Sequence, residues 1–498
     1  MGEEVGTIIS SEETPSPEEF NFVLQEPVKK GQFVQFSTEE GEAVARVSNV
    51  RKTNRYFMEA ESVSEYEQSG TPLENILPTE DWEYLVGEGQ VLGVYDSDGM
   101  IQRPSFPPSP GTGVEEVDED RLQDFLGIQD SGVNIGNVQF HDLEASLGLT
   151  DLLQKHMAIL AQTGAGKSYL ASVLLEELLD RDEDEGQVAV VALDPHGEYA
   201  GFAEDEEYMQ RVKVYGDGDI QVSVPGLTTG KFDHYFSDVS APQKREMQKV
   251  LNGLDDEKGV YGLEDVIERV EEREMNQSTR EVWMDRLRRM RYMNLFKRYD
   301  SPSMDKVEPG KMLVLDLSEI VDRKKKQVIA AYFTDRLFRE RRNGNIPPFF
   351  LLVEEAHNFI PEGVSSSDAP ARSPITKIAR EGRKFHASLG LISQRPAKLS
   401  QTVLSQCNTN MILRITNPYD LDRIKQGSEG ITSDVLESIP GLRVGETVVV
   451  GEAVNYPTFV DVRERNTSEF DTGKPLEEAA KDYSEEMEQE DEDVETFM

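Results

Sequence analysis

A short glycine-bearing stretch that ends in lysine and serine is the part of the sequence best suited to hold phosphate groups. An apolar run, Met157–Leu160, leads into AQTGAGKS and then into a segment with helical periodicity. Gly164 and Gly166 allow the backbone N–H groups to curl around an anion, and the start of a helix adds its positive dipole end. Lys167 would reach the outer phosphates, and the Ser168 hydroxyl would coordinate Mg²⁺. The predicted phosphate-binding residues are Gln162, Thr163, Gly164, Ala165, Gly166, Lys167, Ser168 and Tyr169.

Two adjacent carboxylates follow a second apolar run. Phe349–Val353 is followed at once by Glu354 and Glu355. Ligands in open α/β sheets gather at the carboxyl ends of strands, where this pair would lie. Glu354 would hold Mg²⁺, directly or through water, and Glu355 would polarise an attacking water. A solvated acidic turn is the alternative, and the phosphate-binding loop upstream favours the catalytic interpretation.

A glutamine ends a third apolar segment, ASLGLIS, at Gln394. A glutamine beside the carboxylate strand can sense the γ-phosphate or orient water, although alone it would be read as an ordinary polar strand end. Taken together, the three strand ends look like a RecA-like P-loop ATPase core of the α/β class. The predicted cofactors are ATP and Mg²⁺, and the predicted catalytic residues are Lys167, Glu355 and Gln394.

The segments around these motifs indicate how the chain is organised. Strand-like and helix-like patterns alternate around the three motifs, as in a core with a parallel sheet. Short β-rich segments upstream predict a small antiparallel barrel, and PSFPPSPGTG has the composition of a linker. The predicted parts are a disordered N-terminus (1–18), a β-barrel (19–103), a linker (104–134), the ATPase core (135–470) with a helical insertion at about 203–308, and a disordered acidic tail (471–498).

The composition excludes several classes of protein. Among 498 residues, 52 Lys and Arg stand against 95 Asp and Glu, giving a formal net charge of −43. No run approaches the roughly 18 apolar residues of a membrane span, and the N-terminus lacks a basic and then apolar leader. The single cysteine, Cys407, excludes an internal disulfide framework and a Cys-rich zinc site. We therefore expect a soluble cytoplasmic protein without a membrane partner.

The acidity has two interpretations. Eight of the eleven residues from Glu485 to Glu495 are acidic, which is typical of an interaction tail. The excess is also spread through segments such as Asp180–Glu185 and Glu204–Glu207. A diffuse acidic surface suits a cytoplasm at very high salt, where screening weakens the repulsion between carboxylates. The second pattern favours a halophilic source.

Four sequence blocks resemble one family of ring-forming motors. They are LAQTGAGKS (160–168), LDPHGEYA (193–200), FLLVEEAHNFIPE (350–362) and AREGRKFHASLGLISQRPAKLSQTVLSQCNTNMILRITNP (379–418). Over about residues 20–465 the chain is similar to archaeal HerA-type DNA translocases, which are relatives of FtsK motors. The resemblance implies a homohexamer that encloses double-stranded DNA and hydrolyses ATP between subunits. It also implies a helicase or translocase role in DNA end resection and repair with a NurA-type nuclease.

The resemblance adds residues to the site. Asp194, His196 and Glu198 match the second block, and Glu198 would contact the metal and its waters. A zinc ligand is the weaker interpretation of His196, because no cluster of Cys or His accompanies it. This chain has Glu354 where the family often has Asp, and Ala161 at the first position of the loop motif, where Gly is usual. Both departures are mild.

A basic segment supplies candidates for an arginine that acts on the neighbouring subunit. Arg372–Lys398 holds seven basic residues and one acidic residue in a chain that is otherwise acidic. A ring ATPase needs an arginine from one subunit to stabilise charge on the γ-phosphate of the next. Arg380 and Arg383 are the candidates, and they share roughly one helix face, so the sequence does not choose between them. The alternative is a basic helix paired with acidic neighbours.

Contacts to DNA and the cargo itself stay open at this level. A motor that ignores sequence needs basic side chains for phosphates, and the candidates are Arg286–Arg298, Arg323–Lys326, Arg395 and Lys398. The first of these has the spacing of a packed amphipathic helix. Two further functions are possible: a motor for another cargo, such as conjugative DNA, phage DNA or protein, and a nucleotide-regulated ring scaffold that controls a defence or nuclease effector.

Overall fold

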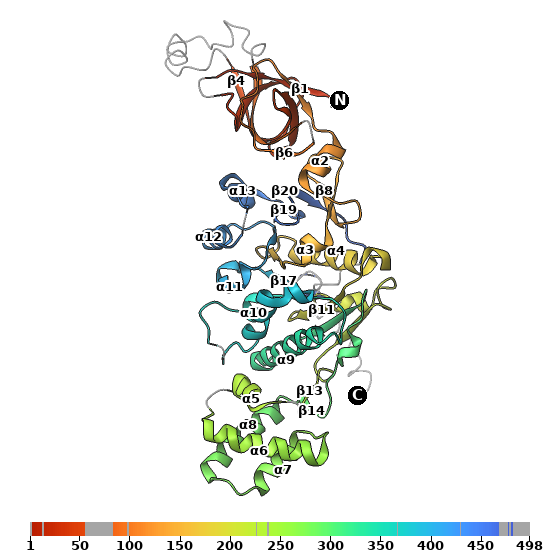
Figure 1. Ribbon diagram of the computed structural model, residues 1–498, viewed down its shortest axis with the longest axis vertical. Coiled ribbons are helices and arrows are strands. Elements are labelled where there is room, and N and C mark those ends of the chain that lie inside the picture. Colours follow the sequence, from red (N-terminus) through yellow and green to blue (C-terminus); the bar gives the residue numbers. More distant parts are fainter. Residues whose placement is uncertain are drawn as a thin grey trace, which may run out of the picture.

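Three parts follow one another along the long axis of the molecule (Figure 1). A β-barrel lies at one end, an α/β core lies in the middle, and a group of helices lies at the other end. This computed structural model describes residues 2–11, 14–54, 83–96, 99–225, 227–236, 239–365, 367–428 and 430–467, together with Glu477, Ala480 and Lys481. Most of the predicted acidic tail and residues 55–82 of the predicted barrel lie outside the described residues.

Six antiparallel strands close the barrel. The ring runs β2-β1-β7-β3-β4-β5, and β5 pairs back onto β2, while β6 adds a short pairing to β5. Phe20, Phe22 and Phe36 fill the interior with Val5 and Val114. The strands are β1 (Glu4–Ile9), β2 (Glu19–Leu24), β3 (Phe33–Thr38), β4 (Gly41–Asn54), β5 (Glu83–Tyr95), β6 (Ile101–Gln102) and β7 (Gly113–Glu116).

Two of these strands differ from the sequence-based organisation. Residues 1–18 were expected to be disordered, but Glu4–Ile9 form β1, which pairs with both β2 and β7. Strand β7 and the helix α2 (Glu119–Leu126) lie inside the segment expected to be a linker. The cause is long-range: β1 buries Val5, Gly6 and Ile8 without a regular alternation, and a six-residue strand gains its stability from neighbours that sequence periodicity does not reveal.

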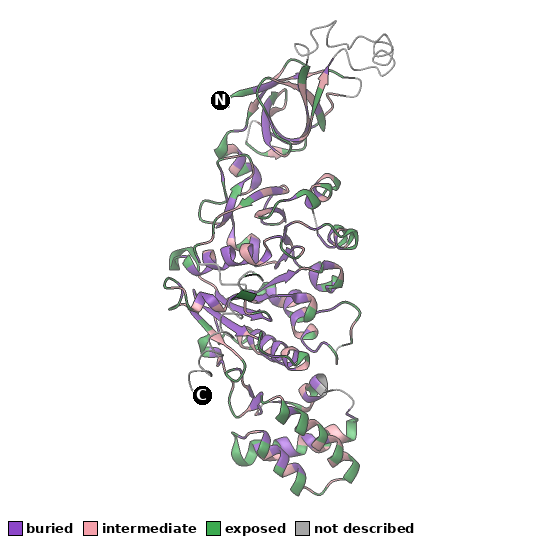
Figure 2. Cartoon of the chain, turned by 180° about the vertical axis from the view of Figure 1, so that it is seen from behind, coloured by how far each residue is buried: buried purple, intermediate pink, exposed green. Residues whose placement is uncertain are grey.

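The core is built on one sheet of eleven strands. Seven are parallel, in the order β12-β15-β11-β16-β17-β10-β18, and four antiparallel strands, β19, β20, β8 and β9, extend the edge. The central strands are almost wholly buried (Figure 2), as their continuous Val, Ile, Leu and Ala runs require. The strands are β8 (Val133–Val138), β9 (Glu144–Leu147), β10 (Met157–Leu160), β11 (Ala189–Asp194), β12 (Val212–Tyr215), β15 (Met312–Asp316), β16 (Phe349–Val353), β17 (Ala387–Ser393), β18 (Thr409–Ile412), β19 (Glu446–Gly451) and β20 (Thr458–Val462).

The strand order places the predicted site residues at one edge of the core sheet. Strands β11, β16, β17 and β10 are consecutive neighbours, and all four run parallel. Their carboxyl ends therefore bring Asp194, Glu354, Gln394 and the phosphate-binding loop side by side. The helices of the core are α3 (Leu149–Leu153), α4 (Lys167–Asp180), α9 (Arg323–Arg342), α10 (Arg372–Glu381), α11 (Gln401–Leu404), α12 (Pro418–Gly427) and α13 (Ser433–Ser438).

A helical insertion separates β12 from β15. Its helices pack around Trp283, whose ring meets Phe232 edge-on at 5.9 Å and whose indole N–H donates to the Gln243 carbonyl. A short parallel pair, β13 (Val222–Ser223) and β14 (Phe296–Lys297), lies at its base. The expected insertion began at about residue 203, but Val212–Tyr215 is an edge strand of the core sheet. The helices are α5 (Thr229–Phe236), α6 (Ala241–Lys258), α7 (Leu263–Glu272) and α8 (Gln277–Tyr292).

The barrel contacts the core through a few specific interactions. Buried Arg46 of β4 forms an ion pair with Asp434 of α13. The Tyr456 ring stacks on Phe125 of α2 at 4.5 Å, and its hydroxyl donates to the Leu92 carbonyl of β5 at 2.9 Å. Within the described residues, no helix combines the length and the hydropathy that crossing a bilayer requires.

Strand β1 provides a direct test of the closed barrel. Ile8→Ala should lower the free energy of unfolding by about 2–4 kcal/mol, because the Ile8 side chain is 1% exposed inside the barrel. Ile9→Ala is the matched control, since Ile9 is adjacent and only half-buried. The measurement is equilibrium denaturation followed by circular dichroism. Equal stability of the two variants and the wild type would show that β1 does not close the barrel.

Candidate functional site

The predicted phosphate-binding loop joins β10 to α4 at the carboxyl edge of the sheet. Gly164 and Gly166 have φ angles of +75° and +95°, which favour glycine. The Ala161 N–H donates to the Ser393 carbonyl at 3.2 Å, and the Gln162 N–H donates to the Arg414 carbonyl at 3.0 Å. A side chain added at Gly164 would meet nothing within 4 Å, so the loop encloses open space above the start of α4.

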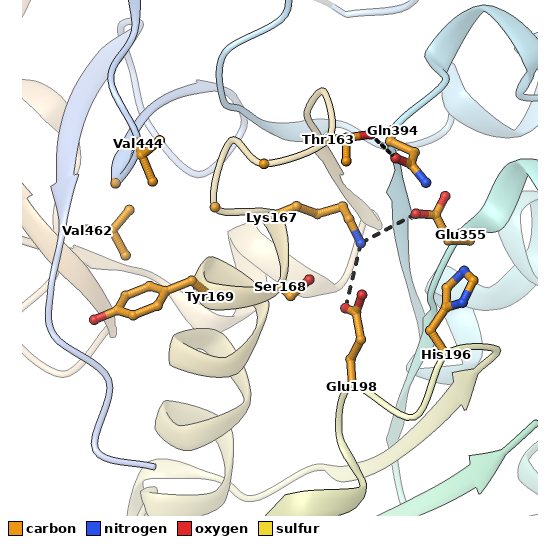
Figure 3. A pocket seen from close by; sticks show the side chains of 13 residues that line it. Thr163, Lys167, Ser168, Tyr169, His196, Glu198, Glu355, Gln394, Val444 and Val462 are labelled. Atoms are coloured by element: carbon orange, nitrogen blue, oxygen red, sulfur yellow. Dashed lines mark hydrogen bonds and ion pairs between the residues drawn. The ribbon is translucent and has the colours of Figure 1, made fainter. Parts of the chain in front are cut away.

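Lys167 lies among three carboxylates, of which Figure 3 shows Glu198 and Glu355. Its Nζ donates to Glu354 Oε1 and lies 3.6 Å from Glu355 Oε1 and 3.7 Å from Glu198 Oε2. Lys167 is 8% exposed, so these charges interact in a region with little water. Burial alone would lower the pKa of Lys167, but the carboxylates outweigh burial and raise it. The lysine is therefore held as a cation.

Glu354 is fully buried and both of its oxygens are engaged. Oε1 accepts from Lys167, and Oε2 accepts from the Tyr199 hydroxyl at 2.8 Å. Burial raises the pKa of Glu354 to about 7, against the opposing effect of Lys167. Sequence reasoning missed Tyr199. The block LDPHGEYA shows a tyrosine after a strand end, and a buried tyrosine hydroxyl needs a partner, but the block does not reveal that this partner is Glu354.

Glu355 occupies a strained position that aims its carboxylate into the cavity. Its φ is +48°, a conformation that is uncommon for non-glycine residues. Glu355 Oε2 lies 3.0 Å from His357 Nδ1, which is also 3.1 Å from Ser393 Oγ. Burial would raise the pKa of Glu355, but His357 and Lys167 outweigh it and lower the pKa. Glu355 is thus ionised, and His357 is a further site residue that the motifs did not indicate.

The predicted residues of the block LDPHGEYA have two different positions. Asp194 is fully buried and accepts backbone N–H groups of His196, Gly197 and Tyr199 at 2.8–3.1 Å. It therefore shapes the turn that carries Tyr199, and it does not face the cavity. His196 and Glu198 do line the cavity. No metal-binding cluster of three or more His, Cys, Asp or Glu side chains occurs in the part of the chain that the structure describes.

These groups line a cavity of about 740 Å³. The loop contributes Thr163, Gly164, Gly166, Lys167, Ser168 and Tyr169 to its wall. Gln394 also lines it and accepts a hydrogen bond from the Thr163 hydroxyl. Two predicted residues do not: the Gln162 side chain accepts from Thr416, and Ala165 is buried behind the loop. Any contribution of these two to phosphate binding would come from their backbone.

Arg380 and Arg383 lie far from their own loop. They flank the amino end of β17, whereas Gln394 and the loop lie beyond its carboxyl end. Seven residues of strand separate the two edges by roughly 23 Å. Both arginine side chains are exposed. The buried His156 fixes this segment, since it bonds the Ala379 carbonyl and accepts the Leu389 N–H.

The basic segments considered for DNA have different environments. Three lysines at the start of α9 are held within the chain: Lys324 by the Ser367 carbonyl, Lys325 by Asp217 and Lys326 by the Pro195 carbonyl. In Arg286–Arg298, the apolar side chains Leu287, Met290, Leu295 and Phe296 are buried in the insertion. Arg395 and Lys398 are exposed near the carboxyl end of β17.

The residues present fit a magnesium–nucleotide complex. Mg²⁺ prefers oxygen ligands and keeps several waters, so it is bound by few protein groups together with substrate phosphates. The Ser168 hydroxyl lines the cavity beside the carboxylates of Glu198 and Glu355. Glu198 Oε2 is a buried atom without a hydrogen bond, which suits a site that is completed by an incoming cation and its waters.

Comparisons with known proteins agree with this arrangement. A family model described as the central domain of helicase HerA matches residues 133–337. The DNA double-strand break repair helicase HerA of Pyrococcus furiosus is 27% identical, over 93% of this chain and 92% of that protein. The protein of the same name from Saccharolobus solfataricus is 24% identical, over 92% of each chain.

The chain is similar to HerA helicases over most of its length. This confirms the resemblance found in the four sequence blocks, and it makes the protein an ATP-hydrolysing enzyme of the helicase and translocase class. Two solved structures share the fold of this chain. VirB4 of Thermoanaerobacter pseudethanolicus has a TM-score of 0.54 and 16% identity over 68% of this chain and 98% of its own. The plasmid coupling protein TrwB, solved with an ATP analogue, has a TM-score of 0.51 and 12% identity over 72% and 95%. The predicted P-loop core with an N-terminal barrel is therefore confirmed.

The buried charge cluster predicts how stability responds to its removal. Lys167→Ala should lower the free energy of unfolding of the nucleotide-free protein by about 3 kcal/mol, because it leaves buried carboxylates without their cation. The double variant Lys167→Ala/Glu354→Gln should recover part of this loss. Denaturation of both variants and of Glu354→Gln alone completes a double-mutant cycle. Strict additivity would contradict the coupling of Lys167 to Glu354.

Proposed function

We propose that this protein is an ATP- and Mg²⁺-dependent translocase or helicase that acts on double-stranded DNA. The observation that carries the proposal is the position of Lys167, Glu355 and Gln394 around one cavity at the carboxyl edge of the sheet. A lysine at the start of a helix, an ionised carboxylate and a glutamine are the groups that phosphoryl transfer to water requires. We infer the DNA substrate from the relatives, which are named DNA double-strand break repair helicases.

Each residue has a role that follows from its surroundings. Lys167 exchanges its partner Glu354 for the phosphates of the nucleotide, and the backbone around Gly164 and Gly166 surrounds them. Glu355, kept ionised by its neighbours, accepts a proton from the attacking water. Gln394, held by Thr163, orients that water or senses the γ-phosphate. When bound, Mg²⁺ neutralises phosphate charge, with Ser168 as a ligand and Glu354 acting directly or through water.

The assembly and partners belong to the same proposal. A homohexamer would bring Arg380 or Arg383 of one subunit to the phosphates held by the next, which suits their exposure on the edge opposite their own loop. The ring would encircle DNA and supply single strands to a NurA-type nuclease in end resection. Arg395 and Lys398, exposed near the site edge, are the retained candidates for phosphate contacts. The halophilic source stays a prediction from the net charge of −43.

Hydrolysis with and without DNA tests the motor function. At about 2 M KCl, linear double-stranded DNA should raise the ATPase rate of the wild type, because a translocase couples hydrolysis to its track. Glu355→Gln should lower kcat by at least about 100-fold while retaining ATP binding, since it removes the base and keeps the shape. Undiminished hydrolysis in this variant would overturn the role of Glu355. If DNA does not change the rate of ATP hydrolysis, the motor moves another cargo. If the wild type does not hydrolyse ATP, the protein is a regulated scaffold.

Mixed rings test the arginines. Arg380→Ala or Arg383→Ala should abolish most of the ATPase activity. Mixing whichever of these two variants is inactive with Glu355→Gln should restore activity. At equal mixing, about one quarter of the interfaces would pair an intact Glu355 with an intact arginine. Lys384→Ala is the control, because Lys384 is basic, exposed and next to Arg383. Mixtures that are no more active than the separate variants would exclude action between subunits.

A further inference from the structure

One buried histidine lies at the amino edge of the core sheet, away from the nucleotide cavity. His156 is 2% exposed and lies between α3 and β10. The four residues of β10, roughly 13 Å of strand, separate it from the phosphate-binding loop of its own subunit. Its φ of +64° is uncommon for a residue other than glycine. This side chain therefore cannot touch the nucleotide that its own loop would hold, and its contacts must have another purpose.

Both ring nitrogens of His156 are bonded to backbone groups on either side of one turn. Nδ1 accepts the Leu389 N–H at 3.1 Å, so Nε2 carries the proton and donates to the Ala379 carbonyl at 3.1 Å. Burial lowers the pKa of His156 to about 4, which keeps the imidazole neutral at neutral pH. A neutral imidazole has one donor and one acceptor, and these two bonds use both. The ring thus connects the last turn of α10 to β17.

The chain between these two bonds carries the predicted arginines. Arg380 follows Ala379, and Arg383 follows Gly382, so each arginine adjoins a residue in contact with the histidine ring. Gly382 packs so closely that a carbon atom added to it would lie 3.3 Å from His156 Cε1 and 2.3 Å from a carbonyl oxygen of β17. Ala379 and Gly382 are buried, whereas both arginine side chains are exposed. The arginines therefore extend from a fixed base.

A second set of contacts holds the end of the same turn. Arg341 of α9 donates from Nε to the Phe385 carbonyl at 2.7 Å. The Phe349 N–H at the start of β16 donates to the His386 carbonyl at 3.2 Å. His156 fixes the start of the turn and these bonds fix its end. The turn is thus pre-organised by contacts within its own subunit.

We infer that His156 is a positioning residue for the arginine that acts on the neighbouring subunit, because it holds the turn that carries Arg380 and Arg383. The inference rests on the proposed function, from which it takes the ring and the action of an arginine between subunits. A donor to the γ-phosphate must be held close to its final place, and a displacement of about 1 Å can cost about 100-fold in rate. Loss of the two bonds of His156 should therefore impair hydrolysis in the next subunit and spare its own site.

Replacement of His156 separates this role from a role in its own nucleotide site. His156→Phe keeps an aromatic ring and removes both hydrogen bonds, so kcat should fall by about 10- to 100-fold in uniform rings. The dissociation constant of ATP should stay within about twofold of the wild-type value, because the phosphate-binding loop is intact. His156→Gln should restore most of the rate, since its amide again offers one donor and one acceptor. The rates are measured under the same salt and DNA conditions as for Glu355→Gln.

Mixed rings show on which subunit His156 acts. Rings of His156→Phe and Glu355→Gln should regain activity, because at equal mixing about one quarter of the interfaces pair an intact Glu355 with a well-placed arginine. Rings of His156→Phe and the inactive arginine variant should stay inactive, since neither subunit supplies a working arginine. If His156 served its own site, these two results would be reversed, and that outcome overturns the inference.

Thr409→Val is the matched control at the same end of β10. Thr409 is fully buried on β18, which flanks β10 on the side opposite β17. Its hydroxyl donates to the Asp151 carbonyl and accepts the Ala453 N–H, both at 3.2 Å. Valine has a similar shape and removes these two bonds, so the free energy of unfolding should fall while kcat is retained.

A further variant moves the turn without changing the histidine. Gly382→Ala should displace the turn from β17 and behave like His156→Phe in both mixtures, which keeps the test decisive if His156→Phe does not fold. If Arg380→Ala and Arg383→Ala both hydrolyse ATP at the wild-type rate, the proposed action of an arginine between subunits fails, and this inference fails with it. If one of them is inactive while His156→Phe is fully active, only the positioning role is overturned. Loss of ATP binding in His156→Phe would also overturn it.

Discussion

A lysine buried among three carboxylates is the constraint on which the site depends. Lys167 lies at the first residue of α4, Glu354 and Glu355 follow β16, and Glu198 follows β11. Lys167, Glu354 and Glu355 are buried, and none of these three charges would be tolerated alone there, since the desolvation of an unpaired ion costs several kcal/mol. The strand order must therefore place the ends of β10, β16 and β11 within reach of each other. The parallel sheet and its crossover helices meet that requirement.

The cluster also explains why its members differ in protonation. Burial is the largest influence on Glu354 and raises its pKa to about 7, whereas His357 and Lys167 keep the pKa of Glu355 below its usual value. Two adjacent glutamates thus divide their roles by environment. The strained φ of Glu355 separates the two carboxylates, so that Glu354 faces Lys167 and Tyr199 while Glu355 faces the cavity.

The sequence indicated the site more completely than the fold. Lys167, Ser168, Glu355 and Gln394 were identified because their chemistry is local: each follows a recognisable strand or opens a recognisable helix. Other members could not be found this way. Tyr199 matters only because β11 lies beside β16, and β1 is a strand only because β2 and β7 flank it. Both depend on pairings between distant segments, which motif spacing does not encode.

The antiparallel edge of the sheet shows how parts of the chain that carry no motif still shape the cavity. A single run, from α13 to the start of β19, pairs with Arg46 of the barrel through Asp434 and supplies Val444 and Gly445 to the cavity wall. Only ten residues separate Gly445 from Asp434, and they pack through buried Val435, Ile439 and Leu442. Effects of substitutions at the two ends should therefore be non-additive, because they act on one packed element. The barrel is thus joined to the nucleotide cavity by continuous structure, although it contributes no residue to the cavity's chemistry.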